Sequence, residues 1–358
     1  MSNEPRLKSV VVGCRMGSGH ARAMIDSGQY ELAALCDLNE QTARQAAARL
    51  RAPEPRVYTD FAQMLDAERP DVVTVATPND SHCALTLQAA EFGVRAICAE
   101  KPMAVNLGQG RQMVETCRRR GVRLTVNHQR RLKADLLMAR RLIEAGAVGQ
   151  VYLLRATHAG DVLSDGTHAV DSLRHLAGDR PAKWVFGAIH RRTPREGEPK
   201  GMGYDASGGC RYGHAIESAA MATWEFEGGL RAEVLSGELR FPGRPYQDYE
   251  VLGTQGRLWR VGDRYETPVL IENHEGRGFR VVDLDPAELA RDPMAESYRL
   301  LARQVREGGE HPLSGESGLD DLEIVMAIYE SARLRQPVSL PLNQDEYPLE
   351  LMVRDGQA

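Results

Sequence analysis

The chain has 358 residues and a formal charge of −5, from 45 Lys and Arg against 50 Asp and Glu. This length suits about two domains, and the hydrophobic (42%) and charged (27%) fractions exclude wholesale disorder. The weak negative charge argues against a dedicated nucleic-acid-binding protein, which usually contains a basic domain.

The sequence shows neither a membrane-spanning segment nor an export signal. No run of about eighteen apolar residues is present, and the polar start leads directly into an apolar strand. None of the six cysteines lies within three residues of another, which argues against a redox pair or a zinc ribbon. We therefore expect a cytoplasmic protein with reduced cysteines and no metal.

The first 130 or so residues alternate apolar runs with segments of helical periodicity. The expected strands are Ser9–Val12, Glu31–Cys36, Val72–Ala76, Val94–Ala99 and Val122–Val126. The expected helices are Gly19–Ser27, Glu40–Leu50, Ser81–Phe92 and Leu107–Arg120. Alternation of helices with continuously apolar strands predicts an α/β domain with a doubly wound parallel sheet, over residues 1–128.

The remaining residues, 129–358, have a different rhythm. Helices are expected over Lys133–Ala145, His168–Leu176, Met294–Arg306 and Leu319–Arg335. Strands are expected over Val151–Ala156, Trp184–His190, Ala219–Phe226, Leu230–Ser236, Asp248–Gly253 and Arg257–Val261. The pair Gly228-Gly229 is typical of a hairpin turn, and Arg192–Gly213 of a long surface or lid-like loop. This pattern predicts a second α/β domain with a large, mostly antiparallel sheet, and a C-terminal helix that can pack back on the first domain.

A glycine-rich turn between the first strand and its helix is the sharpest local feature. Gly13 and Gly17 permit a tight turn and close approach of a pyrophosphate to a helix N-terminus. Arg15 stands where a strict fingerprint has another glycine, and it either pairs with the pyrophosphate or points to solvent. A glycine-rich turn without a ligand is the alternative.

Asp37 ends the second apolar run, 24 residues after Gly13. A carboxylate about 20 residues after the glycine turn binds the adenosine ribose hydroxyls in dinucleotide-binding proteins. It also repels a 2′-phosphate, which favours NAD over NADP. The alternative role of Asp37 is to cap the following helix.

Polar clusters follow three strands at the carboxyl edge of the predicted sheet, where ligands bind in such folds. These clusters are Thr77-Pro78-Asn79-Asp80-Ser81-His82, Glu100-Lys101-Pro102 and Asn127-His128-Gln129-Arg130-Arg131. A lysine here can stabilise the alkoxide that develops when a hydride leaves a carbinol. Ordinary turn chemistry and a surface lysine are the alternatives.

With these residues in view, the chain resembles the glucose–fructose oxidoreductase / inositol dehydrogenase (Gfo/Idh/MocA) family over nearly its whole length. The matching segments are Gly13–Ala21, Asp37, Thr77-Pro78-Asn79 with His82, Glu100–Ala104, Arg130-Arg131, Asp165–His168 with Asp171, Gly253–Gly256 and Tyr329–Ala332. The resemblance implies a Rossmann domain, NAD, a secondary alcohol of a sugar or cyclitol as substrate, and a homodimer or homotetramer formed through the large sheet.

The resemblance also implies the site. Lys101 and His168 would flank the reacting carbinol. The family's further aspartate would fall at Ser164, so either Asp165 replaces it or the catalytic set is Lys101 and His168. The candidate cofactor-binding residues are Gly13, Arg15, Met16, Gly17, His20, Asp37, Thr77, Pro78, Asn79, His82, Glu100 and Lys101. The candidate substrate-binding residues are Asn127, His128, Arg131, His158, Asp161, His168, Arg211 and His214.

Three functions remain open from the sequence. The first is hydride transfer from a carbinol to NAD, with His168 as base because an unperturbed imidazole titrates near neutral pH. The second is a glycoside hydrolase that uses NAD for transient oxidation, elimination, water addition and re-reduction. The third is an NAD-sensing binding protein without catalysis. Several cations in the candidate set hint at an anionic or heavily hydroxylated substrate.

Overall fold

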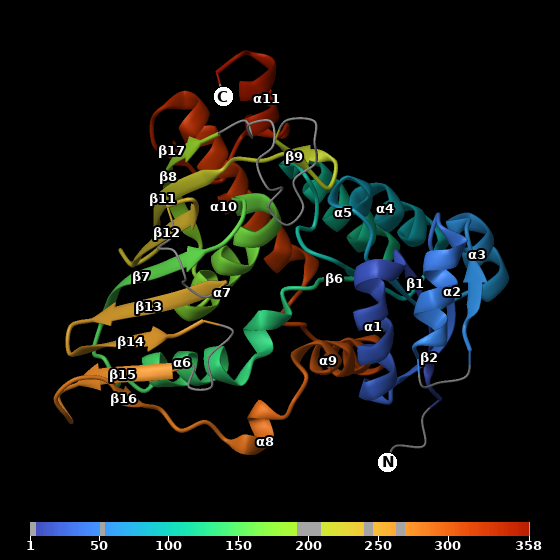
Figure 1. The fold of residues 1–358 in the computed structure, drawn as a ribbon, viewed down its shortest axis with the longest axis horizontal. Helices are drawn as coiled ribbons and strands as arrows, with labels where there is room; N and C mark the ends of the chain where they lie inside the picture. The colour runs from blue at the N-terminus through green and yellow to red at the C-terminus, as the bar shows by residue number, and fades with distance from the viewer. Residues whose placement is uncertain (1–4, 51–53, 192–208, 240–245, 263–268, 358) are drawn as a thin grey trace. The chain divides into compact units, whose positions relative to one another are not determined.

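The structure is a computed structural model and describes residues 5–50, 54–191, 209–239, 246–262 and 269–357. It forms two compact units, coloured along the chain in Figure 1. The first unit contains residues 1–104, 109–129 and 291–319, and the second contains 105–108, 130–290 and 320–358. The first unit thus includes a segment far beyond residue 128.

The first unit contains a six-stranded parallel sheet. Its strands are β1 (Leu7–Val12), β2 (Tyr30–Cys36), β3 (Arg56–Tyr58), β4 (Val72–Val75), β5 (Ala96–Ala99) and β6 (Arg123–Val126). Its helices are α1 (Cys14–Ser27), α2 (Glu40–Ala48), α3 (Phe61–Glu68), η1 (Asn79–Ser81), α4 (His82–Phe92), most of α5 (Leu107–Arg120) and α9 (Pro293–Glu307). The strand order β3-β2-β1-β4-β5-β6 confirms the predicted doubly wound sheet.

The core of this unit explains why a late segment belongs to it. Strand residues such as Val11 and Leu35 are buried with Met24 of α1. The α9 residues Tyr298 and Leu301 join the same hydrophobic cluster. Burial of these apolar side chains stabilises α9 on the sheet layer of this unit.

The second unit contains a nine-stranded sheet. Its strands are β7 (Val151–His158), β8 (Ala182–His190), β11 (Ala219–Phe226), β12 (Arg231–Gly237), β13 (Gln247–Gly253), β14 (Gly256–Arg260), β15 (Val269–Asn273), β16 (Arg280–Val281) and β17 (Val338–Ser339). Their order is β16-β15-β14-β13-β7-β12-β11-β8-β17, and the β9 (Cys210–Arg211) and β10 (His214–Ala215) pair forms a separate small hairpin. The sheet is antiparallel except that β12 runs parallel to β7, which confirms the predicted fold class.

The helical segments of the second unit pack mainly on one face of this sheet (Figure 1). They are η2 (Gln129–Leu132), α6 (Ala134–Glu144), η3 (Val162–Gly166), α7 (Thr167–Ala177), α8 (Pro286–Leu289), α10 (Gly315–Leu334) and α11 (Pro348–Arg354). Along β7 and β12, buried and partly exposed residues alternate, as expected for a sheet with one covered face.

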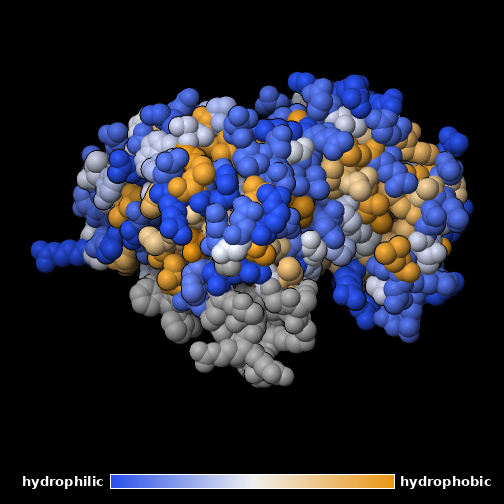
Figure 2. Space-filling model, turned by 90° about the horizontal axis from the view of Figure 1, so that it is seen from above, coloured by the Kyte–Doolittle hydropathy of each residue, from blue (hydrophilic) through white to orange (hydrophobic). Residues whose placement is uncertain are grey.

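The described surface mixes hydrophilic and apolar side chains. On the face drawn in Figure 2, hydrophilic side chains predominate among the described residues, with apolar ones scattered between them. Among the described helices, none is both long and apolar enough to cross a membrane.

Several element boundaries differ from the sequence-based expectation. Helix α1 begins at Cys14, so the glycine turn itself forms the first helical turn. The short elements β3, α3, β9, β10, β15, β16, β17 and α11 were not predicted, because few residues carry each pattern. Gly228 and Gly229 do form the turn between β11 and β12, both with positive φ. Most of the expected loop 192–213 lies outside the described residues.

Candidate active site

The turn after β1 brings the backbone close to a neighbouring strand. Gly13 has φ +87°, and a Cβ there would lie 2.4 Å from the Ala76 carbonyl oxygen. A Cβ at Gly17 would lie 2.6 Å from Val11. Only glycine fits both positions, so the start of α1 lies directly against the β1 and β4 ends.

Helix α1 begins without a capping side chain or an acidic residue in its first turn. Its first amide, at Cys14, donates to the Asp37 carboxylate over 2.8 Å, while Arg15 and Met16 are exposed. The N-terminus of a helix next to glycines fits the pyrophosphate of a dinucleotide. The residues at this turn therefore fit an NAD cofactor, and the placement of Gly13, Arg15, Met16 and Gly17 at its phosphates stays a prediction.

Asp37 is fixed at the end of β2 rather than serving as the helix cap. Its second oxygen accepts the Asn39 amide over 3.0 Å, and it is Asn39 whose side chain caps α2, by accepting the Thr42 amide. Two backbone donors thus hold the half-buried carboxylate in one orientation. Asn39 is therefore the cap of α2, and the ribose-binding role of Asp37 stays a prediction.

A buried ion pair supports the segment after β5. The fully buried His20 ring donates from Nε2 to Glu100 over 2.7 Å, and its Nδ1 contacts the Tyr298 hydroxyl at 2.7 Å. Asn127 also donates to Glu100, over 2.6 Å, and the second Glu100 oxygen accepts the Lys101 amide over 3.1 Å. The backbone that carries Lys101 is therefore anchored to α1 and to the end of β6.

Burial favours neutral forms in this pair, but mutual interaction outweighs it. Burial would raise the pKa of Glu100, yet the hydrogen bond and charge of His20 lower it to about 2. Burial would lower the pKa of His20, yet hydrogen bonds and charge from Cys98 and Glu100 raise it to about 10. Both groups are therefore charged at neutral pH, and His20, expected to bind cofactor, is a buried partner of Glu100 instead.

His82 joins two of the predicted polar clusters. This buried ring contacts the Thr77 carbonyl at 2.8 Å and the Pro102 carbonyl at 2.8 Å. The hydroxyl of Ser81 donates to the Thr77 hydroxyl over 2.6 Å, and Asn79 is buried within η1. His82, like His20, thus supports the carboxyl edge from inside rather than presenting an exposed donor there.

The segment that leads to His168 is a single π-helical turn, η3, followed directly by α7. The Gly166 amide donates to the Asp161 carbonyl over 2.9 Å, the long-range bond of such a turn. The Asp161 side chain caps the turn at the Ser164 amide over 2.6 Å. A Cβ at Gly166 would lie 2.5 Å from the His158 ring, so glycine is required there.

Asp165 is engaged with protein donors. Its carboxylate accepts from Arg211 on one oxygen and from the Tyr246 hydroxyl on the other. Arg211 also reaches Asp161, at 3.2 Å. Burial, followed by the negative charge of Asp165, raises the pKa of Tyr246. The predicted catalytic carboxylate is therefore the acceptor of an ion pair, and Arg211 is neutralised by two carboxylates.

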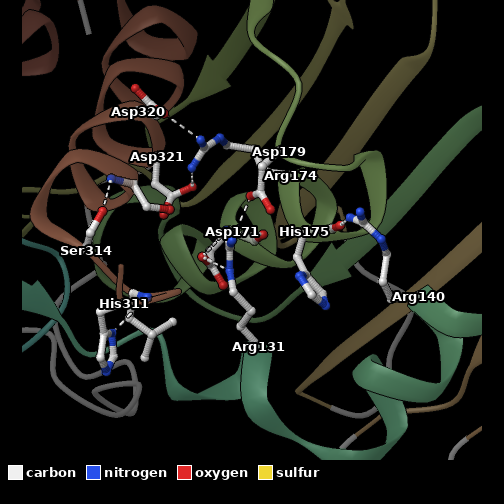
Figure 3. A network of polar contacts seen from close by, with 12 residues as sticks. Arg131, Arg140, Asp171, Arg174, His175, Asp179, His311, Ser314, Asp320 and Asp321 are labelled. Atoms are coloured by element: carbon white, nitrogen blue, oxygen red, sulfur yellow. Dashed lines mark hydrogen bonds and ion pairs between the residues drawn. The ribbon is translucent and has the colours of Figure 1, made fainter. Parts of the chain in front are cut away.

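Figure 3 shows a second ion-pair network, which includes Asp171 and Arg174 of α7. These two residues follow His168 by about one and two helical turns. Arg131 binds Asp171 at 2.7 Å and Asp179 at 2.6 Å. Arg174 binds Asp321 at 2.8 Å and Asp320 at 2.6 Å. The buried guanidinium of Arg131 is thus paired with two carboxylates of the second unit, and its substrate-binding role stays a prediction.

The remaining candidates are buried side chains. His158 lies under Gly166, and His214 contacts the Ser164 hydroxyl at 3.1 Å. Asn127 is committed to Glu100, and His128 is buried beyond β6. Asn127 thus contacts the segment that carries Lys101, and His158 and His214 contact the segment that leads to His168.

Sequence reasoning gave no role to Glu217, Tyr246, Gln247 or Tyr329. All four contact the segment Asp161–Gly166 through side-chain atoms. Tyr329 did fall in a segment typical of the family, but neither spacing nor composition links the other three to η3.

Comparison with known proteins agrees with both units. Residues 7–128 match the model of an oxidoreductase family with an NAD-binding Rossmann fold. Residues 136–259 match the GFO/IDH/MocA C-terminal domain.

Curated relatives cover most of the chain. The D-apiose dehydrogenase of Paraburkholderia graminis is 30% identical over an alignment of 374 positions, which covers 98% of this chain and 94% of the relative. The myo-inositol 2-dehydrogenase of Thermotoga maritima is 24% identical over 345 residues, which cover 91% and 96%.

Solved structures share the fold. A levoglucosan dehydrogenase in complex with NADH and L-sorbose has a TM-score of 0.79 at 21% identity, with coverage of 94% of this chain and 100% of that one. The WlbA dehydrogenase from Bordetella pertussis, in complex with NADH and UDP-GlcNAcA, has a TM-score of 0.74 at 23% identity, covering 95% and 100%.

Proposed function

Because the chain belongs to the Gfo/Idh/MocA oxidoreductase family, we propose that it oxidises a secondary alcohol of a sugar or cyclitol with NAD. One observation carries this proposal. The buried His20–Glu100 pair holds the segment Glu100-Lys101 at the carboxyl edge of an NAD-binding sheet. The sugar and cyclitol dehydrogenases among the relatives support the substrate class.

In the proposed reaction, the Lys101 ammonium and the His168 imidazole have different tasks. NAD, when bound, supplies the hydride acceptor. The Lys101 ammonium donates a hydrogen bond to the carbinol oxygen and stabilises the negative charge that develops on it. His168 accepts the hydroxyl proton as general base. Asp165 takes no proton in this scheme, because Arg211 and Tyr246 stabilise its charged form.

We further propose a preference for NAD over NADP. The Asp37 carboxylate is held by the Cys14 and Asn39 amides, so it cannot rotate away without losing two hydrogen bonds. A fixed negative charge at the ribose hydroxyls discriminates against a 2′-phosphate through repulsion.

The charge balance supports a neutral, hydroxylated substrate over an anionic one. Two of the cations in the candidate set, Arg131 and Arg211, are each paired with two carboxylates. A substrate carboxylate would have to displace one of these partners, and burial makes that displacement costly.

The test is a panel of neutral sugars, cyclitols, sugar acids and glycosides, screened by NADH fluorescence. We expect NADH formation with a neutral polyol, and His168→Ala to lower turnover by about 10²-fold or more while NAD binding is retained. Unchanged turnover in this variant would remove His168 as base. Aglycone release without net NADH would favour the redox glycoside hydrolase, and tight NAD binding without any turnover would favour the sensing protein.

The homo-oligomer is proposed to form through the open face of the nine-stranded sheet. Met221 of β11 and Phe186 of β8 lie on the same face of neighbouring strands and are 50% and 39% exposed. Exposed apolar side chains on a sheet face favour association. Light scattering of wild type and Met221→Arg tests this, since a monomeric wild type would contradict the proposal.

A further inference from the structure

We propose that Glu217 and Tyr329 are positioning residues for the reaction, because their side chains clasp the η3 turn that places His168. This inference rests on the proposed function and adds two residues to it. Neither is proposed to contact the substrate. Their role is to fix the backbone between Asp161 and Gly166.

Glu217 binds the start of the turn and the tyrosine at the same time. One oxygen accepts the Val162 amide over 2.7 Å, and the other accepts the Tyr329 hydroxyl over 2.7 Å. The residue is only 1% exposed. Among the described residues this carboxyl group has no cationic hydrogen-bond partner, and burial of such a group is costly unless hydrogen bonds compensate it.

Tyr329 completes the clasp from α10. Its hydroxyl donates to Glu217 and accepts the Leu163 amide over 3.2 Å. Val162 and Leu163 begin the π-helical turn, where amides have no intrahelical partner. The two side chains therefore satisfy consecutive amides that would otherwise be unpaired in the protein interior.

The far end of the turn has its own support. The Gln247 side-chain amide donates to the Asp165 carbonyl over 3.1 Å, and the Tyr249 hydroxyl holds Gln247 over 2.7 Å. The turn is thus held at both ends by side chains from other elements, and His168 follows it by two residues. Because a π-turn is rarely stable by itself, its geometry depends on these outside contacts.

Burial and the charge of Asp161 raise the pKa of Glu217 to about 8, although the hydrogen bonds from Tyr329 and Val162 act to lower it. A neutral carboxyl can serve as hydrogen-bond partner without adding a third negative charge beside Asp161 and Asp165. We therefore expect the hydrogen bonds, and not a charge, to hold the turn. Glu217→Gln retains a carbonyl oxygen for Val162, whereas Glu217→Ala removes it.

The experiment is hydrogen–deuterium exchange of the full chain, with peptides covering 160–170. Tyr329→Phe and Glu217→Ala should speed exchange in this segment by roughly ten-fold, since each removes a hydrogen-bond partner from a buried amide. Glu217→Gln should stay close to wild type. The matched control is Tyr30→Phe, which removes a buried hydroxyl that donates to the Tyr298 carbonyl over 2.7 Å and belongs to the first unit.

Activity gives the second readout on the substrate that the panel identifies. Tyr329→Phe should lower kcat while the KM for NAD is unchanged, and the Tyr30→Phe control should leave kcat unchanged. Equal exchange in wild type and Tyr329→Phe, or loosening spread over all peptides of 130–290, overturns the clasp. Absence of turnover in the wild type refutes the proposed function alone, because the exchange result still decides the clasp.

Discussion

The buried pair between His20 and Glu100 gives the sharpest stability prediction. His20→Gln removes the cation and leaves the Glu100 carboxylate buried. Loss of one partner of a buried ion pair costs about 3–5 kcal/mol. Because Asn127 still donates to Glu100 over 2.6 Å, we expect the lower end, about 3 kcal/mol in the free energy of unfolding. For a domain of this size that corresponds to a fall in Tm of roughly 6–12 °C.

The pH dependence follows from the two pKa shifts. The His20 pKa rises from 6.5 to about 10, so its stabilisation is complete below pH 6.5 and is lost as the pH rises through about 10. The Glu100 pKa falls from 4.5 to about 2, so its stabilisation is present above pH 4.5 and is lost as the pH falls through about 2. The deficit of His20→Gln should therefore be largest between pH 4.5 and 6.5 and shrink towards pH 10.

A double-mutant cycle measured by thermal unfolding with and without NAD isolates the pair. His20→Gln combined with Glu100→Gln removes both charges and should recover most of the stability that either single variant loses. The control is Arg44→Gln in the exposed pair with Glu40, for which we expect less than about 0.5 kcal/mol. If the two single losses simply add in the double variant, the pair does not stabilise the unit and this reasoning fails.

Three further predictions concern the glycine turn after β1, the choice of cofactor and the clasp formed by Glu217 and Tyr329. Gly13→Ala should weaken NAD binding in fluorescence titration by at least about ten-fold, because φ is +87° and the Cβ would lie 2.4 Å from a carbonyl oxygen. Gly19→Ala, with no atom within 4 Å of its Cβ, should bind like wild type. Asp37→Asn should lower the ratio of kcat/KM for NAD to kcat/KM for NADP by about ten-fold or more, because it removes the charge that repels a 2′-phosphate. The raised Glu217 pKa means that stability falls as the pH rises from 4.5 through about 8, by up to ~1.4 kcal/mol per pH unit, and Glu217→Gln should flatten that slope in melts from pH 5 to 9.

The fold was predictable where one residue pattern dominates a segment. The apolar runs at Val10–Val12 and Val72–Val75 are buried on both faces, and they form β1 and β4 of the parallel sheet. The parallel pairing of β7 with β12 was not predictable, because the local alternation along a strand is the same in either direction. The α9 helix shows a helical pattern, but nothing in that pattern says which core buries it.

The candidate site was predictable to the level of segments and much less to that of side chains. The segment Glu100-Lys101 stands out by its place after a strand, but the partnership of Glu100 with His20 joins residues 80 positions apart. Arginine is a residue type that commonly binds anionic ligands, yet Arg131 is buried and paired with the Asp171 carboxylate. Whether a charged side chain meets a ligand or another side chain depends on tertiary contacts, and single-sequence patterns do not contain them.

The displaced aspartate shows how a local backbone change alters what a carboxylate can do. In the chain the carboxylate stands directly before Gly166, one position later than the family pattern expects. A π-turn accommodates one more residue per turn than an α-turn, and η3 occupies this stretch. The resulting Asp165 faces Arg211 and Tyr246, and both donate hydrogen bonds to its carboxylate. In the proposed scheme, proton transfer is then left to His168, so the rigidity of the turn that precedes it bears on catalysis more directly than the charge of Asp165 does.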